Sequence, residues 1–216
     1  SQVLEEELQA DRQHGVCVLS GPNLAKEIVA GKPSSTVVAS ADKSAATRVQ
    51  SIINSSVFRV YINDDIVGVE LCGALKNIIA LGAGISDGLD LGDNAKAAFL
   101  TRGLAEITRL GVAAGAIPAT FAGLAGLGDL VATCSSAFSR NHYVGEQLAL
   151  GRSLEEIRDT MHNVAEGVDT TRAALSLAER LGVEMPIARA IYDVLFGGVS
   201  GTDAVVRLMG RDPRSE

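Results

Sequence analysis

The hydrophobic pattern of the chain changes its period once, near Asp64–Asp65, and this change constrains the fold more than any other feature. Before it, short apolar runs rich in β-branched residues at 16–20, 35–40 and 57–64 indicate strands, and helical spacing appears between them. After it, only helical patterns follow. We therefore predict two parts: residues 1–65 from a parallel or mixed α/β sheet domain, and residues 66–216 as an all-helical domain.

The spacing of apolar residues predicts where most helices lie. A short helix is expected within 21–31, with Asn23 as its N-cap and Gly31 as its C-cap. The segment "GAGISDG" at 82–88 lacks G-x-G-x-x-G spacing and follows a helical pattern, so we interpret it as a helix end rather than a dinucleotide-binding turn. The longer helices are expected at 41–55, 67–83, 94–110, 139–150, 153–161, 168–181, 186–196 and 202–208.

Composition excludes several classes of function. The net charge is -7 and no basic run is present, which argues against a duplex nucleic-acid binder. Three cysteines without a CxxC pair indicate reduced thiols and a cytoplasmic protein, and the histidines lack metal-ligand spacing, so no metal is predicted. The uncharged stretch 111–128 is mostly Gly and Ala around Pro118, too weakly hydrophobic for a membrane span.

Lys76 lies in "GVELCGALKN" (68–77), one of the most apolar segments of the chain. An unpaired ammonium is costly to bury, so an inward lysine must be paired or must shift its pKa. Two interpretations stay open. The side chain can lie along apolar surface with its head in water. Alternatively, it can donate a proton or polarise a carbonyl group in a water-poor cleft, beside Asn77.

A second candidate site lies in "FAGLAGLGDLVATCSSAFSRN" (121–141). Asp129 is the only acidic residue of this apolar, glycine-rich stretch, and Thr133 follows one helical turn later. Ser139, Arg140 and Asn141 stand where a helix is expected to begin, so helix N–H groups and a guanidinium could bind an anion there. The alternative is an ordinary N-cap at Ser139 followed by a solvated arginine.

A third candidate is "LSGPNLAKE" (19–27), where a predicted strand ends in a turn and a helix opens. Ligands of open α/β sheets bind outside the carboxyl ends of strands, so this turn is a candidate cleft wall. An ordinary strand–helix turn would have the same sequence pattern.

These segments occur in one order with "GLDLGDNAKAAFLTRGLAE" (88–106) and "VAEGVDTT" (164–171). Together they resemble the bacterial NAD(P)-dependent glycerol-3-phosphate dehydrogenase family over essentially the whole chain. The resemblance implies a mainly α fold, with the trailing α/β part of a Rossmann domain before an all-α domain like the C-terminal domain of 6-phosphogluconate dehydrogenase. It also implies a homodimer that interconverts dihydroxyacetone phosphate and sn-glycerol 3-phosphate by hydride transfer with NAD or NADP, for phospholipid synthesis.

The resemblance further implies a role for each residue that matches a family motif. Lys76 would be the catalytic acid/base, and Ser139, Arg140 and Asn141 would clamp the substrate phosphate. The residues implied around the substrate are Gly21, Asn23, Lys76, Asn77, Asp129, Thr133, Ser139, Arg140 and Asn141. Those implied at the cofactor are Ala25, Arg140, Val164 and Glu166. The family commonly has Ser or Thr where Asn23 stands.

One departure from the family pattern is large. The first Rossmann half, with its G-x-G-x-x-G turn and a further lysine, does not occur in these 216 residues, so we expect the main cofactor-binding loop to be absent from this chain. Two other interpretations stay open: a non-catalytic helical dimerisation or metabolite-binding module derived from such an enzyme, and a related dehydrogenase of the hydroxyacid or 6-phosphogluconate type.

Overall fold

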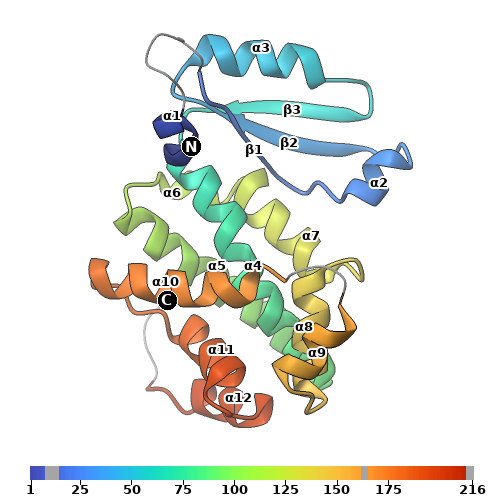
Figure 1. Cartoon of the computed structure of the whole chain (residues 1–216), viewed down its shortest axis with the longest axis vertical. Coiled ribbons are helices and arrows are strands. Elements are labelled where there is room, and N and C mark those ends of the chain that lie inside the picture. Colours follow the sequence, from blue (N-terminus) through green and yellow to red (C-terminus); the bar gives the residue numbers. More distant parts are fainter. Residues whose placement is uncertain (8–14, 162–164, 213–216) are drawn as a thin grey trace. The chain divides into compact units, whose positions relative to one another are not determined.

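The computed structural model describes residues 1–7, 15–161 and 165–212, and Figure 1 shows their helices and strands. The chain forms two compact units, one from residues 1–73 and 111–132 and the other from residues 74–110 and the described residues after 132. The divisions fall inside helices rather than in loops. The predicted domain boundary after residue 65 stays a prediction.

The first unit contains a three-stranded sheet in the order β1 (Val18–Ser20), β2 (Ser34–Ala39), β3 (Phe58–Asn63). Strand β1 pairs antiparallel with β2, and β2 pairs parallel with β3, so the predicted strands and the mixed sheet are confirmed. Helix α3 (Lys43–Ile53) lies along one face of this sheet (Figure 1), where Val38, Ala46 and Val60 form a buried apolar cluster.

The short helix of the first unit, α2 (Ala25–Val29), begins differently from the prediction. Its N-cap is Leu24, without a side-chain cap, so the prediction of Asn23 as the N-cap is wrong. The Asn23 amide instead donates to the Thr36 hydroxyl at 2.7 Å, which ties the turn after β1 to strand β2. The helix ends at Val29 and its C-cap is Ala30, so the prediction of Gly31 as the C-cap is wrong by one residue; Gly31 follows with a left-handed φ of 73°.

Helices make up the rest of the described chain. All of the helices expected after the boundary are confirmed, and 82–88 lies inside a helix as predicted. The sequence patterns missed the helices at 118–135, because Gly and Ala carry little hydrophobic periodicity. The elements are α1 (Gln2–Glu7), α4 (Ile66–Gly88), α5 (Gly92–Ala113), α6 (Pro118–Phe121), the π-helix η1 (Leu124–Gly128), α7 (Asp129–Ser135), α8 (Arg140–Ala149), α9 (Leu154–Thr160), α10 (Gly167–Leu181), α11 (Pro186–Phe196) and α12 (Gly201–Met209).

Helix α4 is long and apolar enough, by length and composition alone, to cross a membrane. Of its most apolar window, 56% is buried within the chain, which is typical of a core helix. Segments 118–135 and 140–149 pass the same test only as a pair bent by 51°. The uncharged stretch 111–128 is divided among the end of α5, α6 and η1.

Asp65 organises the helices of the first unit. It is buried, and its carboxylate accepts a hydrogen bond from the Gly68 N–H at 2.8 Å, which caps the start of α4. Its second oxygen accepts hydrogen bonds from the Ile117 N–H at 2.8 Å and the Thr120 hydroxyl at 2.7 Å. One carboxylate therefore joins the beginnings of α4 and α6.

Glu106 has the same role in the second unit. Its side chain is buried in α5 and accepts hydrogen bonds from the Ile187 N–H at 2.9 Å and the Ala188 N–H at 2.8 Å, in the first turn of α11. Burial raises the pKa of this carboxyl group, although the two backbone hydrogen bonds oppose the shift. The position of α11 on α5 therefore depends on one buried acid.

We expect Glu106→Gln to destabilise the protein by about 1–3 kcal/mol, because an NH₂ group would then face a buried backbone N–H that has lost its acceptor. Urea unfolding measures the change, and Glu179→Gln, an exposed change in α10, is the matched control. Equal stability of the Glu106→Gln variant and the parent would contradict the role of this carboxylate.

Candidate functional site

Helix α8 begins where the sequence predicts, and its cap is the predicted one. The Ser139 hydroxyl accepts a hydrogen bond from the His142 N–H at 3.2 Å, and α8 starts at Arg140. Arg140 and Asn141 consequently occupy the first turn, where the helix dipole favours bound negative charge.

The side chain of Asn141 joins three helices of the second unit. It is buried, and its amide nitrogen donates to the Asn77 side-chain oxygen in α4 at 3.0 Å. Its amide oxygen accepts from the Gly167 N–H at the start of α10 at 2.9 Å. A carboxamide can do both at once because it carries a donor and an acceptor on one planar group. The predicted residues Asn77 and Asn141 are therefore brought together.

Gly167 allows this close approach. A Cβ atom added there would lie 2.6 Å from the Asn77 backbone oxygen and 2.7 Å from the Asn141 side-chain oxygen. Both distances are far below normal van der Waals contact, so a side chain would force α10 away from α4 and α8. Sequence reasoning missed this residue, although it stands in the quoted segment 164–171 beside Glu166.

Arg140 and Glu166 form an ion pair at the same place. The guanidinium Nη2 lies 2.5 Å from the Glu166 carboxylate, and both side chains are about half exposed, at 45% and 50%. An ion pair this exposed contributes little to stability. It can therefore open when another anion competes for the guanidinium.

A second charged group fastens α8 to its neighbours. Asp87 in α4 accepts hydrogen bonds from Lys96 Nζ at 2.6 Å and interacts with His142 Nε2 at 2.7 Å. Burial would raise the pKa of Asp87, but the hydrogen bonds from Lys96 and His142 lower it below its ordinary value. These residues hold the first turn of α8 against α4 and α5, and the sequence contained no spacing signal for them.

The remaining predicted site residues fall in both units. Lys76 is half-buried in α4, directly before Asn77, and Thr133 is buried in α7. Val164 lies outside the described residues. The predicted residues of the first unit are Gly21, Asn23, Ala25 and Asp129. Their roles in binding stay predictions.

Asp129 opens α7 directly after the π-helix η1, a type of element that is frequent at functional sites. The side chain is buried, and its charge reaches Cys72. Burial, with the charges of Asp65 and Asp129, raises the pKa of the Cys72 thiol to about 12. Cys72 is therefore a protonated, unreactive thiol. Within 1–7, 15–161 and 165–212, no three His, Cys, Asp or Glu side chains are grouped to hold a metal ion.

Comparison with known proteins defines first the class and then the family. Solved structures with a Rossmann part and an all-helical C-terminal domain share this fold, which confirms the predicted fold class. Residues 65–206 match the model of the NAD-dependent glycerol-3-phosphate dehydrogenase C-terminus, and residues 1–46 match that of its N-terminus. The chain therefore belongs to the NAD-dependent glycerol-3-phosphate dehydrogenase family, as the resemblance predicted.

Individual relatives agree with this assignment. Glycerol-3-phosphate dehydrogenase [NAD(P)+] of Dehalococcoides mccartyi is 53% identical over 216 residues, which are all of this chain and 60% of that protein. The protein of the same name from Bacillus thuringiensis is 57% identical over 218 residues, covering the whole chain and 64% of the relative. This chain thus spans under two thirds of the length of these relatives.

Two solved structures share the fold, at 41% and 29% sequence identity. Glycerol-3-phosphate dehydrogenase from Coxiella burnetii is 41% identical with a TM-score of 0.89, over 92% of this chain and 61% of that one. The enzyme of the same name from Saccharomyces cerevisiae is 29% identical with a TM-score of 0.77, over 86% of this chain and 57% of that one.

We expect Gly167→Ala to destabilise the second unit by about 1–3 kcal/mol, because the added methyl group overlaps Asn77 and Asn141. The Asn141 side-chain NH₂ resonances should shift as its hydrogen bonds lengthen. Thermal unfolding and amide NMR measure both effects. Gly128→Ala is the control, since its added Cβ would meet no atom closer than 3.6 Å. Equal effects of the two substitutions would refute the close-packing argument.

Proposed function

We propose that this chain carries the substrate-side part of an NAD(P)-dependent oxidoreductase that interconverts sn-glycerol 3-phosphate and dihydroxyacetone phosphate. The observation that carries the proposal is the buried Asn141 amide, which joins Asn77 to Gly167 and so holds Arg140 and Glu166 near the residue that follows Lys76. Membership of the family, and the name glycerol-3-phosphate dehydrogenase [NAD(P)+] of the relatives, support the proposed substrate and cofactor.

Lys76 is the proposed acid/base. When bound, the nicotinamide supplies or takes up the hydride at the reacting carbon. During ketone reduction negative charge develops on the carbonyl oxygen, and the Lys76 ammonium donates a hydrogen bond to it and then its proton. In the reverse direction the neutral amine takes the hydroxyl proton. Asn77 beside it, with Asp129 and Thr133, would orient the substrate.

Arg140 is the proposed phosphate ligand, together with Ser139 and Asn141 in the first turn of α8. A phosphate dianion competes with the exposed Glu166 carboxylate for the guanidinium, because a bidentate arginine–phosphate contact adds to the helix dipole. The phosphate lies away from the reacting carbon, so its binding energy would orient the ketone. Gly21 and Asn23 are proposed to line the same substrate.

The proposed cofactor contacts are Ala25, Arg140, Val164 and Glu166. The described members of this set fit a dinucleotide, since Arg140 offers donors for phosphate oxygens and Glu166 offers acceptors for hydroxyl groups. Both are about half exposed, so a ligand can reach them. NAD and NADP remain joint candidates in this proposal.

We also propose a cytoplasmic homodimer. The acidic composition and three free thiols support the location, and the Gly- and Ala-rich helices support close packing of two subunits. The competing candidate is a non-catalytic helical dimerisation or metabolite-binding module, which would bind the phosphate ester without turnover.

Titration with sn-glycerol 3-phosphate tests the proposed phosphate site. We expect saturable amide shifts at 139–141, and about tenfold or more weaker binding by Arg140→Gln, because a charge-assisted bidentate contact is lost. Arg180→Gln, an exposed arginine at the end of α10, is the matched control and glycerol the ligand control. Unchanged affinity in Arg140→Gln would refute the role of Arg140.

Turnover tests Lys76. NAD(P)H oxidation by dihydroxyacetone phosphate should fall by about 10²–10⁴-fold in Lys76→Met, because the substitution keeps the length of the side chain and removes the proton. The assay uses this chain joined to the amino-terminal part of the Dehalococcoides mccartyi relative, with exposed Lys43→Met as the control. Full activity of the Lys76 variant would overturn its role. Phosphate binding without turnover in the parent would favour the non-catalytic module.

A further inference from the structure

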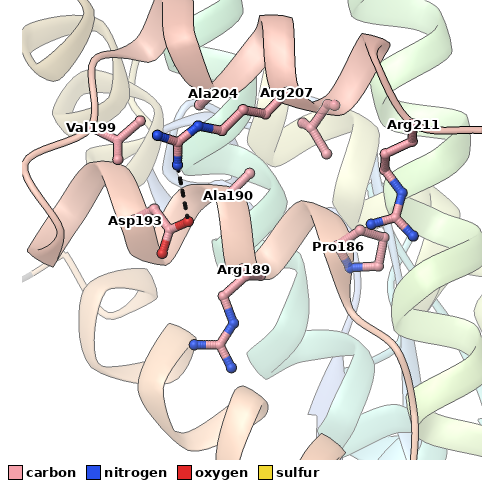
Figure 2. Close-up of a pocket in the computed structure, with 9 residues that line it drawn as sticks. Pro186, Arg189, Ala190, Asp193, Val199, Ala204, Arg207 and Arg211 are labelled. Carbon is pink, nitrogen blue, oxygen red and sulfur yellow. Dashed lines mark ion pairs between the residues drawn. The ribbon is translucent and has the colours of Figure 1, made fainter.

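A small basic pocket lies in the second unit between α11 and α12, and no residue of the proposed substrate or cofactor set lines it. Its volume is about 150 Å³. Three arginines line it, of which Arg207 and Arg211 come from α12 and the residues after it, and Arg189 comes from α11; Figure 2 shows the Arg189 guanidinium directed away from the other two. The apolar part of the lining consists of Pro186, Ala190, Val199, Ala204 and Leu208.

The arginines of this pocket are only weakly neutralised. Arg207 lies 3.8 Å from the Asp193 carboxylate, and Arg211 lies 3.6 Å from that of Glu184. These distances exceed those of charge-assisted hydrogen bonds, about 2.7–2.9 Å. The Arg207 side chain is 63% exposed and that of Arg211 is 42% exposed. Both carboxylates therefore balance charge without occupying the donors of the guanidinium groups.

Arg189 lines the pocket but directs its guanidinium toward Tyr192, which does not line it. Its guanidinium lies 5.4 Å from the centre of the Tyr192 ring, a cation–π contact that uses the face of the group and not its N–H donors. Within the described residues no carboxylate forms an ion pair with Arg189. The pocket therefore presents the guanidinium groups of Arg207 and Arg211, in a chain whose net charge is -7.

The framework of the pocket is rigid on one side. Glu106 fixes the first turn of α11 through the N–H groups of Ile187 and Ala188, directly after Pro186. The Ser200 hydroxyl accepts a hydrogen bond from the Asp203 N–H at 3.0 Å and caps α12. Hydrogen bonds therefore fix the first turns of both helices that carry lining residues.

We propose that this pocket is a second anion site, which binds a small organic phosphate monoester. Neither carboxylate lies within hydrogen-bond distance of the Arg207 or Arg211 guanidinium group, and the planar guanidinium matches phosphate geometry. The apolar lining favours an ester with a short carbon group over inorganic phosphate. The volume suits such a ligand, since a cavity of about 150 Å³ admits a benzene-sized molecule.

A structural role alone would predict a different behaviour. Arginine stems often cover apolar surface while their heads stay in water, and such arginines bind anions no better than other exposed ones. The chain offers a direct comparison, because Arg180 is exposed near the end of α10 and does not line the pocket. An anion-binding pocket and a solvated surface therefore differ in how much a single Arg→Gln change weakens anion binding.

Phenyl phosphate is the probe, titrated into the Arg140→Gln variant of this chain so that the proposed substrate clamp does not contribute. We expect saturable amide shifts at Ala190, Val199 and Ala204, with a Kd on the order of 1 mM. In this background, Arg207→Gln and Arg211→Gln should each weaken binding by at least about threefold and the double variant by about tenfold. Arg180→Gln should leave the Kd unchanged.

Three outcomes would overturn the proposal: no saturable shifts at the pocket, equal weakening by Arg180→Gln, or equal binding of inorganic phosphate and phenyl phosphate. The first two would show solvated surface arginines, and the third would show a site without selectivity for an ester. Failure of sn-glycerol 3-phosphate to bind at 139–141 in the parent chain is a separate result, because it concerns Arg140 and leaves the α11–α12 pocket untouched. Urea unfolding of each variant shows that lost binding is not lost folding.

Discussion

The candidate site of the second unit depends on one side chain, the buried amide of Asn141. Its NH₂ group bonds to Asn77 in α4 and its oxygen bonds to the Gly167 N–H in α10, while its own helix is capped two residues earlier by Ser139. Aspartate at this position could only accept, and leucine could do neither, so each would leave a buried polar group without a partner. This one carboxamide therefore joins the helix that carries Lys76, the helix that carries Arg140 and the start of α10, which Glu166 directly precedes.

Three acids, of which Asp65 and Glu106 are buried and Asp87 is exposed, join helices in this protein. Asp65 joins α4 to α6, Glu106 holds α11 on α5, and Asp87 joins α4 to α8 through His142 and to α5 through Lys96. In the described part of the chain every fully buried side-chain nitrogen or oxygen atom has a hydrogen-bond partner. Acidic residues in an apolar setting are therefore poor markers of catalysis here, because backbone N–H groups at helix starts account for several of them.

The two arginine sites differ in the interactions that would attract an anion. Arg140 stands in the first turn of a capped helix and is held by a close carboxylate, so the dipole, the hydrogen bonds of α8 and a displaceable partner act together. Arg207 and Arg211 stand at the end of a helix, where the dipole favours positive side chains, and their carboxylates lie farther away. The first site is built from backbone and side chain together, and the second from side chains around an apolar floor.

The sequence alone determined the family, the order of the strands and that of the longer helices. The change of period near residue 65 separates strands from helices, and Ser139 marks the start of α8 because a hydroxyl before a polar first turn is a local signal. Asn23 shows the limit of such signals, since its amide bonds to Thr36 on a neighbouring strand instead of capping α2. Only the tertiary structure decided that Asn141 bridges Asn77 and Gly167, that Glu106 caps α11, and that Arg207 and Arg211 line one pocket. These contacts join residues far apart in the chain. The local spacing of apolar residues does not predict hydrogen bonds between helices.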